Sequence, residues 1–215
     1  MCCMSDLAER VERLLDGPRP LPLVLAGDPV LRTRAAAYDF SLPGPLWSEL
    51  LAAMRQTMRT APGVGLAAPQ IGLGIRVAVL EDPALVPPEI AAERNRFPVD
   101  FRVLVNPSYE RLESSDAANP MPTASFYEGC LSVPGYQAVV ARSESVRLRC
   151  SNENGQAVDD IATGWAARIV AHEIDHLDGV LYLDRALTRS LATSGNIAEL
   201  YAGRPMTEIR AALGF

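Results

Sequence analysis

The sequence predicts an α+β fold in a single domain over residues 1–215, and three observations support this prediction. The chain has 215 residues of which 48% are apolar, enough for one sizeable core. Strand-like segments lie at 75–80, 101–109 and 137–150, grouped between helical segments rather than alternating with them, which indicates α+β. Residues 161–177 are apolar on all sides, which is typical of a helix at the centre of a domain.

The N-terminal half is expected to contain two helices before its first strand. Residues 5–15 carry one apolar face and begin at Ser5, a residue type that favours the N-cap position. Residues 46–60 follow helix breakers and have helical apolar spacing. The glycine-rich segment 63–74 leads into the first strand, and the proline-rich segment 82–98 is expected to be a surface loop.

The middle of the chain is expected to supply the remaining strands. Residues 101–109 form a strand that Pro107 should break, because proline lacks the N–H of the sheet ladder. The polar segment 114–125 is expected to be a loop. Residues 137–150 are rich in Val with partial alternation, which predicts one or two strands.

The central helix has recognisable ends. Thr163 is expected to cap the helix at 161–177, and Gly179 lies where a left-handed residue should end it. Residues 186–215 form a C-terminal tail that includes a short helix at 206–213.

Composition excludes several classes of protein. The net charge is −6 without a basic tract, which disfavours direct DNA binding. No apolar run approaches the roughly 18 residues of a membrane span, and a secretory signal is absent. Four cysteines suggest ordinary thiols in a reducing cytoplasm, with Cys2 and Cys3 incidental. Singly scattered arginines are interpreted as a solvated surface: Arg94, Arg96, Arg102, Arg111, Arg142, Arg147 and Arg149.

Both histidines of the chain lie in His172-Glu173-Ile174-Asp175-His176. On a helix, positions i and i+4 share one face, so both imidazoles can reach one metal ion. Glu173, next to the first histidine, can take a proton from a metal-bound water, which is the arrangement of metal-assisted hydrolysis. The alternative is chance, but burying such ionisable groups without a function would be costly.

The third protein ligand stays open at this point. Tyr182 occupies the position where a metzincin would have its third histidine, which argues against that class. Glu199 could serve as in a gluzincin. Cys130, in the turn-like segment 128–132, could supply a thiolate, although a buried structural thiol is the common fate of such a cysteine.

Three segments together resemble the signature motifs of the peptide deformylases. They are Gly63-Val64-Gly65-Leu66-Ala67-Ala68-Pro69-Gln70, Glu128-Gly129-Cys130-Leu131-Ser132 and His172-Glu173-Ile174-Asp175-His176. Their order and separations also fit, and the resemblance covers a core of about residues 20–190. It implies an α+β fold with mixed or antiparallel β-sheets wrapped around a central buried helix that carries the HExxH motif.

The resemblance also implies an activity and a metal site. Cys130, His172 and His176 would bind one divalent metal ion, Fe²⁺ in cells, with Zn²⁺, Ni²⁺ or Co²⁺ able to substitute. A metal-bound water would attack the formyl carbon of N-terminal formyl-methionine in nascent chains and release formate, with Glu173 as general base and acid. The Gln70 amide and the Leu131 N–H would stabilise the resulting oxyanion.

Substrate contacts follow from the same resemblance. The peptide would add as a strand beside Gly63, Val64 and Gly65 on one side and Gly129 on the other. Ile169, with Val64, would line the pocket for the methionine side chain. A phosphate-binding loop at 63–74 is excluded because no Lys-Ser/Thr follows the glycines. The implied partners are N-formyl-methionyl nascent peptides and, transiently, the ribosome.

Two other functions are weighed against this one. A gluzincin-like zinc peptidase using His172, His176 and Glu199 leaves the first two motifs unexplained. A non-catalytic relative that binds N-terminal peptides would be favoured by replacement of Glu173 or Gln70, and both residues are present.

Overall fold

A computed structural model describes residues 3–112 and 122–215. Its α-helices are α1 (Cys3–Leu15), α2 (Gly44–Thr60), α3 (Pro88–Glu93), α4 (Gly164–Leu177), α5 (Ser194–Leu200) and α6 (Met206–Leu213). Its strands are β1 (Gly65–Ala67), β2 (Val77–Asp82), β3 (Val99–Arg111), β4 (Thr123–Cys130), β5 (Val133–Ser143), β6 (Ser145–Ser151), β7 (Ala157–Thr163) and β8 (Ala192–Thr193). Short 3₁₀ helices are η1 (Pro29–Arg32), η2 (Ala68–Ile71), η3 (Tyr182–Asp184) and η4 (Thr188–Ser190).

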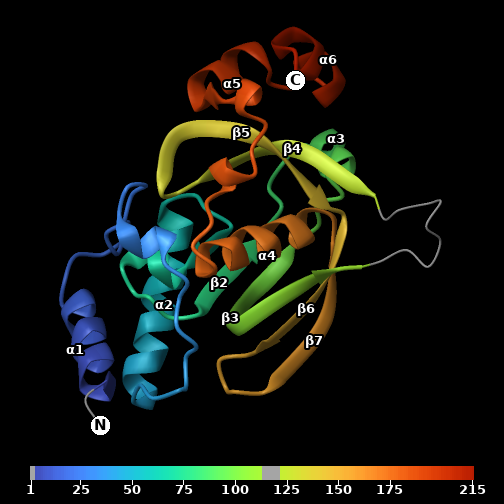
Figure 1. Ribbon diagram of the computed structural model, residues 1–215. Coiled ribbons are helices and arrows are strands. Elements are labelled where there is room, and N and C mark those ends of the chain that lie inside the picture. Colours follow the sequence, from blue (N-terminus) through green and yellow to red (C-terminus); the bar gives the residue numbers. More distant parts are fainter. Residues whose placement is uncertain (1–2, 113–121) are drawn as a thin grey trace.

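The strands form two antiparallel sheets, so the predicted α+β class is confirmed. The larger sheet has the order β1-β2-β3-β6-β7, and the smaller has the order β4-β5-β8. The helix α4 lies between them and contacts strands of both (Figure 1). Residues of two sheets and one helix can therefore meet at a single place.

Burial of α4 explains why its sequence is apolar on nearly all sides. Ile169, Val170 and Ile174 pack against the larger sheet in one core cluster. A second and larger cluster fills the space between α1, α2 and the first strands. The helix ends as predicted, because Gly179 adopts a left-handed φ of 77°.

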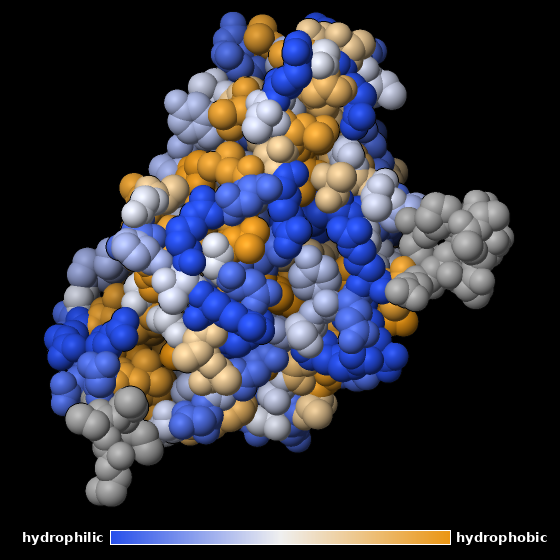
Figure 2. Space-filling model, viewed as in Figure 1, coloured by the Kyte–Doolittle hydropathy of each residue, from blue (hydrophilic) through white to orange (hydrophobic). Residues whose placement is uncertain are grey.

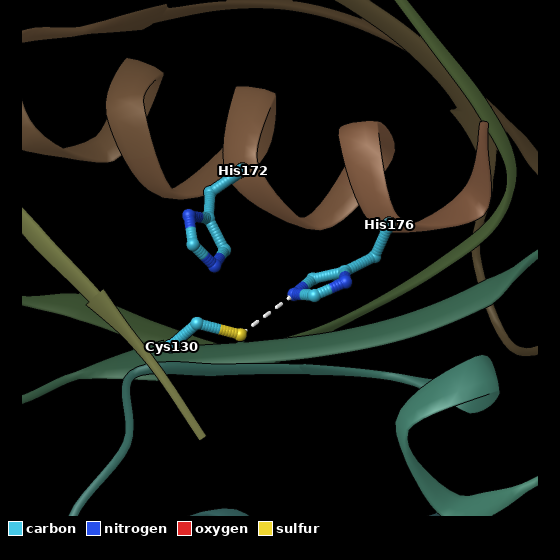
Figure 3. Close-up of side chains that lie close together, drawn as sticks. All are labelled: Cys130, His172 and His176. Atoms are coloured by element: carbon cyan, nitrogen blue, oxygen red, sulfur yellow. Dashed lines mark hydrogen bonds between the residues drawn. The ribbon is translucent and has the colours of Figure 1, made fainter. Parts of the chain in front are cut away.

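The hairpin of β4 and β5 sets the position of the second motif. Gly129 pairs with Gln137, whereas Cys130 pairs with Val133, so the register shifts between two neighbouring residues. Such an irregularity re-aims the side chain that follows it. Here that side chain is Cys130, which points toward α4 (Figure 3).

The N-terminal half differs from the prediction in three places. The first helix begins at Cys3, so Ser5 lies inside it and is not the N-cap. The expected strand at 75–80 is not the first strand, because β1 and η2 precede it within the segment 63–74. The proline-rich segment 82–98 contains the short helix α3, which begins at a proline, a residue tolerated in a first helical turn.

The strand β3 was expected to be broken at Pro107 but continues to Arg111. Its pairing with β6 shifts register between Val105 and Ser108, so the proline lies in a bulge and needs no ladder hydrogen bond. Asn106 in this bulge has φ of 52°, in the left-handed region that asparagine tolerates.

Other elements of the C-terminal half were not predicted, among them β4, β7 and α5. Residues 123–125 of the expected loop at 114–125 belong to strand β4. Residues 114–121 of that loop, and Cys2, lie outside the described residues. The central helix starts at Gly164 because residues 161–163 belong to β7, and Thr163 is its N-cap without a side-chain hydrogen bond. The helix α5 precedes the predicted α6.

The outer face of the smaller sheet is covered by the C-terminal helices. Tyr127 and Val139 pack there against Ile209 of α6. Figure 2 shows apolar side chains between hydrophilic ones around this end of the molecule, and Leu191 and Leu200 are 49% and 48% exposed. Among residues 3–112 and 122–215, the helices are too short or too polar to span a membrane.

Candidate metal centre

Cys130, His172 and His176 come together from two elements. The helix α4 presents both imidazoles on one face, one turn apart, and β4 ends at the cysteine. One ligand atom from each residue lies within 4.8 Å of the other two, and Cys130 Sγ is 3.1 Å from His176 Nε2 (Figure 3). These three residues could therefore hold one metal ion.

The protonation of the two imidazoles is set by their surroundings. Burial, followed by the neighbouring charge of His172, lowers the pKa of His176 well below its ordinary value, so this ring is neutral and can act as a ligand. Burial alone would lower the pKa of His172, but Cys130 and Glu128 raise it well above the ordinary value. The two acceptors beside His172 therefore favour positive charge at this place.

The chemistry of the donor set fits a divalent transition metal. One thiolate and two imidazoles would suit a divalent ion such as Zn²⁺ or Fe²⁺, which would supply Lewis acidity there. Glu199, the other candidate ligand, is exposed on α5 and is not part of this cluster. The histidines thus meet the sulfur ligand and not the carboxylate.

Glu173 is buried beside the two histidines. Its side chain has only 4% exposure, and Oε2 has no hydrogen-bond partner among the described residues. Burial raises the pKa of Glu173 to about 7. The carboxyl group can therefore both accept and return a proton near neutral pH.

Gly65 provides the space that this carboxyl group occupies. A Cβ atom at residue 65 would lie 2.1 Å from Glu173 Oε1 and 2.5 Å from its Cδ, so no other residue fits without displacing Glu173. The first and third motifs therefore meet at this point. The requirement for glycine is steric, since Gly65 does not have a positive φ.

Gln70 connects the first motif to the second. Its Oε1 accepts a hydrogen bond from the Ala67 N–H at 2.9 Å. Its Nε2 lies 3.3 Å from Ser132 Oγ and 3.5 Å from Cys130 Sγ. Gln70 is 2% exposed, and its donor group is held beside Cys130, one of the candidate metal ligands.

Glu128 holds His172 from the side opposite to the sulfur. Its Oε2 is 3.1 Å from His172 Nδ1, which leaves the other ring nitrogen for a metal ion. Arg142 donates to both carboxylate oxygens at 2.6 and 2.9 Å, and Arg168 donates to one. Burial would raise the pKa of Glu128, but the hydrogen bonds from His172 and Arg142 outweigh it and hold the pKa below its usual range.

The same network continues along α4 to Asp175. Arg142 also donates to Asp175 at 2.8 Å, and Arg185 binds both oxygens of Asp175 at 2.8 Å. The interpretation of Arg142 as a solvated surface residue is wrong, since only 5% of it is exposed. The signal that could have found it was the pair of buried acids within the motifs, which required a cation from elsewhere.

A cleft of about 840 Å³ opens onto the three ligands. It brings together all the residues predicted to contact substrate: Gly63, Val64, Gly65, Gln70, Gly129, Leu131 and Ile169. Ile169 is 5% exposed and forms part of the cleft wall on α4. The cleft extends to Trp165 at one end and to Gln137 and Ser194 at the other.

Comparison with known proteins identifies the family. Residues 20–191 match the family model described as polypeptide deformylase. Peptide deformylase 1 of Streptomyces coelicolor is 57% identical, over 97% of this chain and 93% of that protein. Peptide deformylase 3 of Streptomyces avermitilis is 56% identical, over 97% and 90%. The mitochondrial peptide deformylase of Homo sapiens is 39% identical, over 84% and 74%.

Solved structures agree with the sequence relatives. A Met-Ala-Ser-bound class I type b peptide deformylase from Acinetobacter baumannii superposes with a TM-score of 0.65 at 33% identity, covering 77% of this chain and 97% of that one. An actinonin complex of a peptide deformylase from Synechococcus elongatus gives 0.63 at 31% identity, covering 93% and 88%. The chain therefore belongs to the polypeptide deformylase family, a family of hydrolases.

Proposed function

We propose that this chain removes the N-formyl group from the formyl-methionine of newly made polypeptides and releases formate. The observation that supports this function best is the convergence of Cys130, His172 and His176 beside the buried, unpaired carboxyl group of Glu173. A metal site and an acid–base group in one cleft are what amide hydrolysis requires. Membership of the deformylase family selects the formyl amide as the bond.

Cys130, His172 and His176 would hold the ion, and we propose Fe²⁺ as the metal in cells, with Zn²⁺, Ni²⁺ or Co²⁺ as substitutes. A divalent ion in this position supplies Lewis acidity that makes a water molecule nucleophilic at neutral pH. The contact of Glu128 with Nδ1 of His172 supports the assignment, because such contacts fix the orientation of a ligating ring.

Glu173 would take the proton of the attacking water and deliver it to the departing amine. Its pKa of about 7 suits both steps at neutral pH, because the group is then partly deprotonated. Gly65 supports this role, since it is the residue whose missing side chain lets the carboxyl group lie in the cleft.

Gln70 and Leu131 would stabilise the oxyanion that forms on the formyl oxygen. The Gln70 amide lies within 3.5 Å of Cys130 Sγ, so its N–H group is directed at the reacting centre. A donor placed where charge develops is worth roughly 3–4 kcal/mol. Leu131 follows the ligand Cys130 directly and lines the same cleft.

The substrate would lie as an added strand between Gly63–Gly65 and Gly129. These backbone segments border the cleft and carry no side chain larger than that of Val64. The complex of the Acinetobacter relative with Met-Ala-Ser supports a peptide ligand of this kind. Ile169 and Val64 would contact the methionine side chain through apolar surface.

The decisive variant is Glu173→Gln, with formate release from formyl-Met-Ala-Ser as the assay. We expect the variant to keep its metal and lose about 10²–10⁴-fold in kcat, the range for a general base. Glu199→Gln is the matched control, because Glu199 is exposed and outside the ligand cluster, and it should keep full activity and metal.

The outcomes also separate the other two functions. Full activity in Glu173→Gln would exclude the proposed proton transfer. Loss of metal in Glu199→Gln would favour the peptidase ligand set. Peptide binding without formate release by the wild-type chain would favour a binding module.

We further propose that residues 1–215 act as one domain in the cytoplasm, with transient association with the ribosome.

A further inference from the structure

The end of the cleft nearest the start of α4 is lined by arginine and tryptophan. Arg94, Arg96 and Arg168 all border it, together with Trp165. Two of these arginines are neutralised by buried carboxylates. Arg96 binds both oxygens of Asp82 at 2.8 Å, and Arg168 donates to Glu128.

Arg94 differs from its two neighbours because it lacks an anionic partner among the described residues. Its Nε is buried and makes no hydrogen bond within that part of the chain. Its guanidinium carbon lies 4.9 Å from the centre of the Trp165 ring and 5.8 Å from that of Phe126. The rings hold the cation in place but do not satisfy its N–H groups.

The segment that carries Arg94 is fixed on the N-terminus of α4. The backbone N–H of Trp165 donates a hydrogen bond to the backbone carbonyl of Asn95 at 3.2 Å. Gly164, with φ of 57°, lets this segment approach closely, since a Cβ atom there would lie 2.2 Å from the Asn95 oxygen. The ion pair of Arg96 with Asp82 anchors the other side of the segment. Arg94 is thus part of a built wall of the cleft.

The distance from the metal ligands suits the first residues of a peptide. Trp165 and His172 are two helical turns apart, which is about 10 Å along α4. An extended peptide advances about 3.3 Å per residue. For a substrate that runs from the candidate metal ligands toward the start of α4, this spacing puts the side chains of the second and third residues within reach of Arg94.

The charge of this wall contrasts with the charge of the whole chain. The protein carries a net charge of −6, yet the cleft presents a cation that no carboxylate of residues 3–112 or 122–215 pairs with. An acidic side chain of the substrate would supply the missing acceptor. A charge-assisted hydrogen bond in a partly buried place is stronger than one on an open surface.

We propose that Arg94 is a specificity-determining residue that makes this enzyme prefer formyl-methionyl peptides with an acidic side chain at the second or third position. This inference rests on the proposed deformylase function and names a substrate class within it. The carboxylate would accept hydrogen bonds from the guanidinium of Arg94, with Trp165 beside it.

The test compares peptides that differ only in charge. Formate release is measured from formyl-Met-Glu-Ser against formyl-Met-Gln-Ser, and from formyl-Met-Ala-Glu against formyl-Met-Ala-Gln, at low salt. We expect kcat/KM to favour the glutamate peptide about tenfold in at least one pair, the size typical of a hydrogen bond to a charged group. In 0.5 M salt, part of this ratio should be lost.

Arg94→Gln should bring the glutamate-to-glutamine ratio close to one, and the ratio cancels any change common to both peptides. Arg13→Gln is the charge-matched control, because Arg13 is exposed on α1 and should keep the wild-type ratio. Equal rates in both pairs for the wild type, or a ratio that survives in Arg94→Gln, would overturn the proposal. Formate release from the glutamine peptides reports separately on the deformylase function.

Discussion

Two groups of arginine–carboxylate pairs have the same geometry in different surroundings. In the buried network around Glu128, Arg142 Nε lies 2.6 Å from the carboxylate, and both side chains are 4% exposed. On the surface of the larger sheet, Arg147 Nε lies 2.6 Å from Asp159, and these side chains are 47% and 46% exposed. Distance is equal in the two pairs, so any difference in their effects comes from burial.

The comparison shows what each pair can contribute. Water screens the surface pair, and such pairs contribute about 0–1 kcal/mol. The buried ions have given up their hydration, so each depends on its partners, and removing one partner takes hydrogen bonds from charges that water does not reach. The buried network also contacts His172 through Glu128, so a substitution in the network should also change the surroundings of the candidate metal centre.

The largest effect on stability is expected from Arg142→Met. This change leaves Glu128 and Asp175 without their shared cation, which should cost about 3–5 kcal/mol in the free energy of unfolding. Urea unfolding of the metal-free protein measures this cost. Should the variant fail to fold, Arg142→Lys tests the same point through its single charge. A loss below about 1 kcal/mol in the free energy of unfolding would mean that the buried pairs stabilise the fold no more than the exposed pairs do.

The next effect concerns space in the buried region rather than charge. Gly65→Ala should displace the Glu173 carboxyl group and lower kcat for formyl-Met-Ala-Ser by about 100-fold, since small misplacements of catalytic groups are that costly. Gly74→Ala is the control, because a Cβ atom there meets nothing within 4 Å. Normal kcat in Gly65→Ala would show that Glu173 does not need its observed position.

Glu81 lies between the two extremes, with a side chain that is 15% exposed. Hydrogen bonds from Arg55 and then Arg59 lower its pKa to about 2. Because the folded-state pKa is depressed, the stabilisation is complete above the unfolded value near 4.5 and is lost as the pH falls toward about 2. Glu81→Gln should therefore cost about 1–2 kcal/mol at pH 7, after allowance for the exposed arginines.

Chemical unfolding of the wild type and of Glu81→Gln between pH 7 and pH 2 measures this difference. The two free energies should converge at the acidic end. A difference that grows toward low pH would contradict the direction of the shift.

The smallest effect is expected from Arg147→Gln on the exposed sheet face. Its loss should leave the free energy of unfolding nearly unchanged because water screens the exposed pair, and salt should reduce any difference further. Thermal unfolding at two salt concentrations checks this expectation. A loss in the free energy of unfolding as large as that of Arg142→Met would mean that burial does not determine how much these pairs stabilise the fold.

Local patterns in the sequence were enough for α1, α2, α4 and α6 and for the two candidate metal ligands on α4. The spacing of His172 and His176 depends only on the helical period, so it could be predicted before the fold was known. The end of α4 at Gly179 likewise depends on one local conformation.

Elements stabilised by distant partners were missed for a physical reason. Strand β7 carries Asp159 and Asp160, which are unfavourable in strands by themselves. Arg147 on the adjacent strand β6 and Arg102 on β3 pair with them. Arg142 was misinterpreted because Glu128 and Asp175, its partners, are 14 and 33 residues away in sequence. Such pairings depend on the register of the sheets, which the sequence pattern does not define.

The most direct test of the metal centre is the metal content of the protein after anaerobic purification, measured with formate release. Cys130, His172 and His176 should retain one divalent ion per chain, and Cys130→Ala should lower both the metal content and the activity, whereas Glu199→Gln should change neither. Unchanged metal occupancy in Cys130→Ala, or loss of metal in Glu199→Gln, would contradict the account.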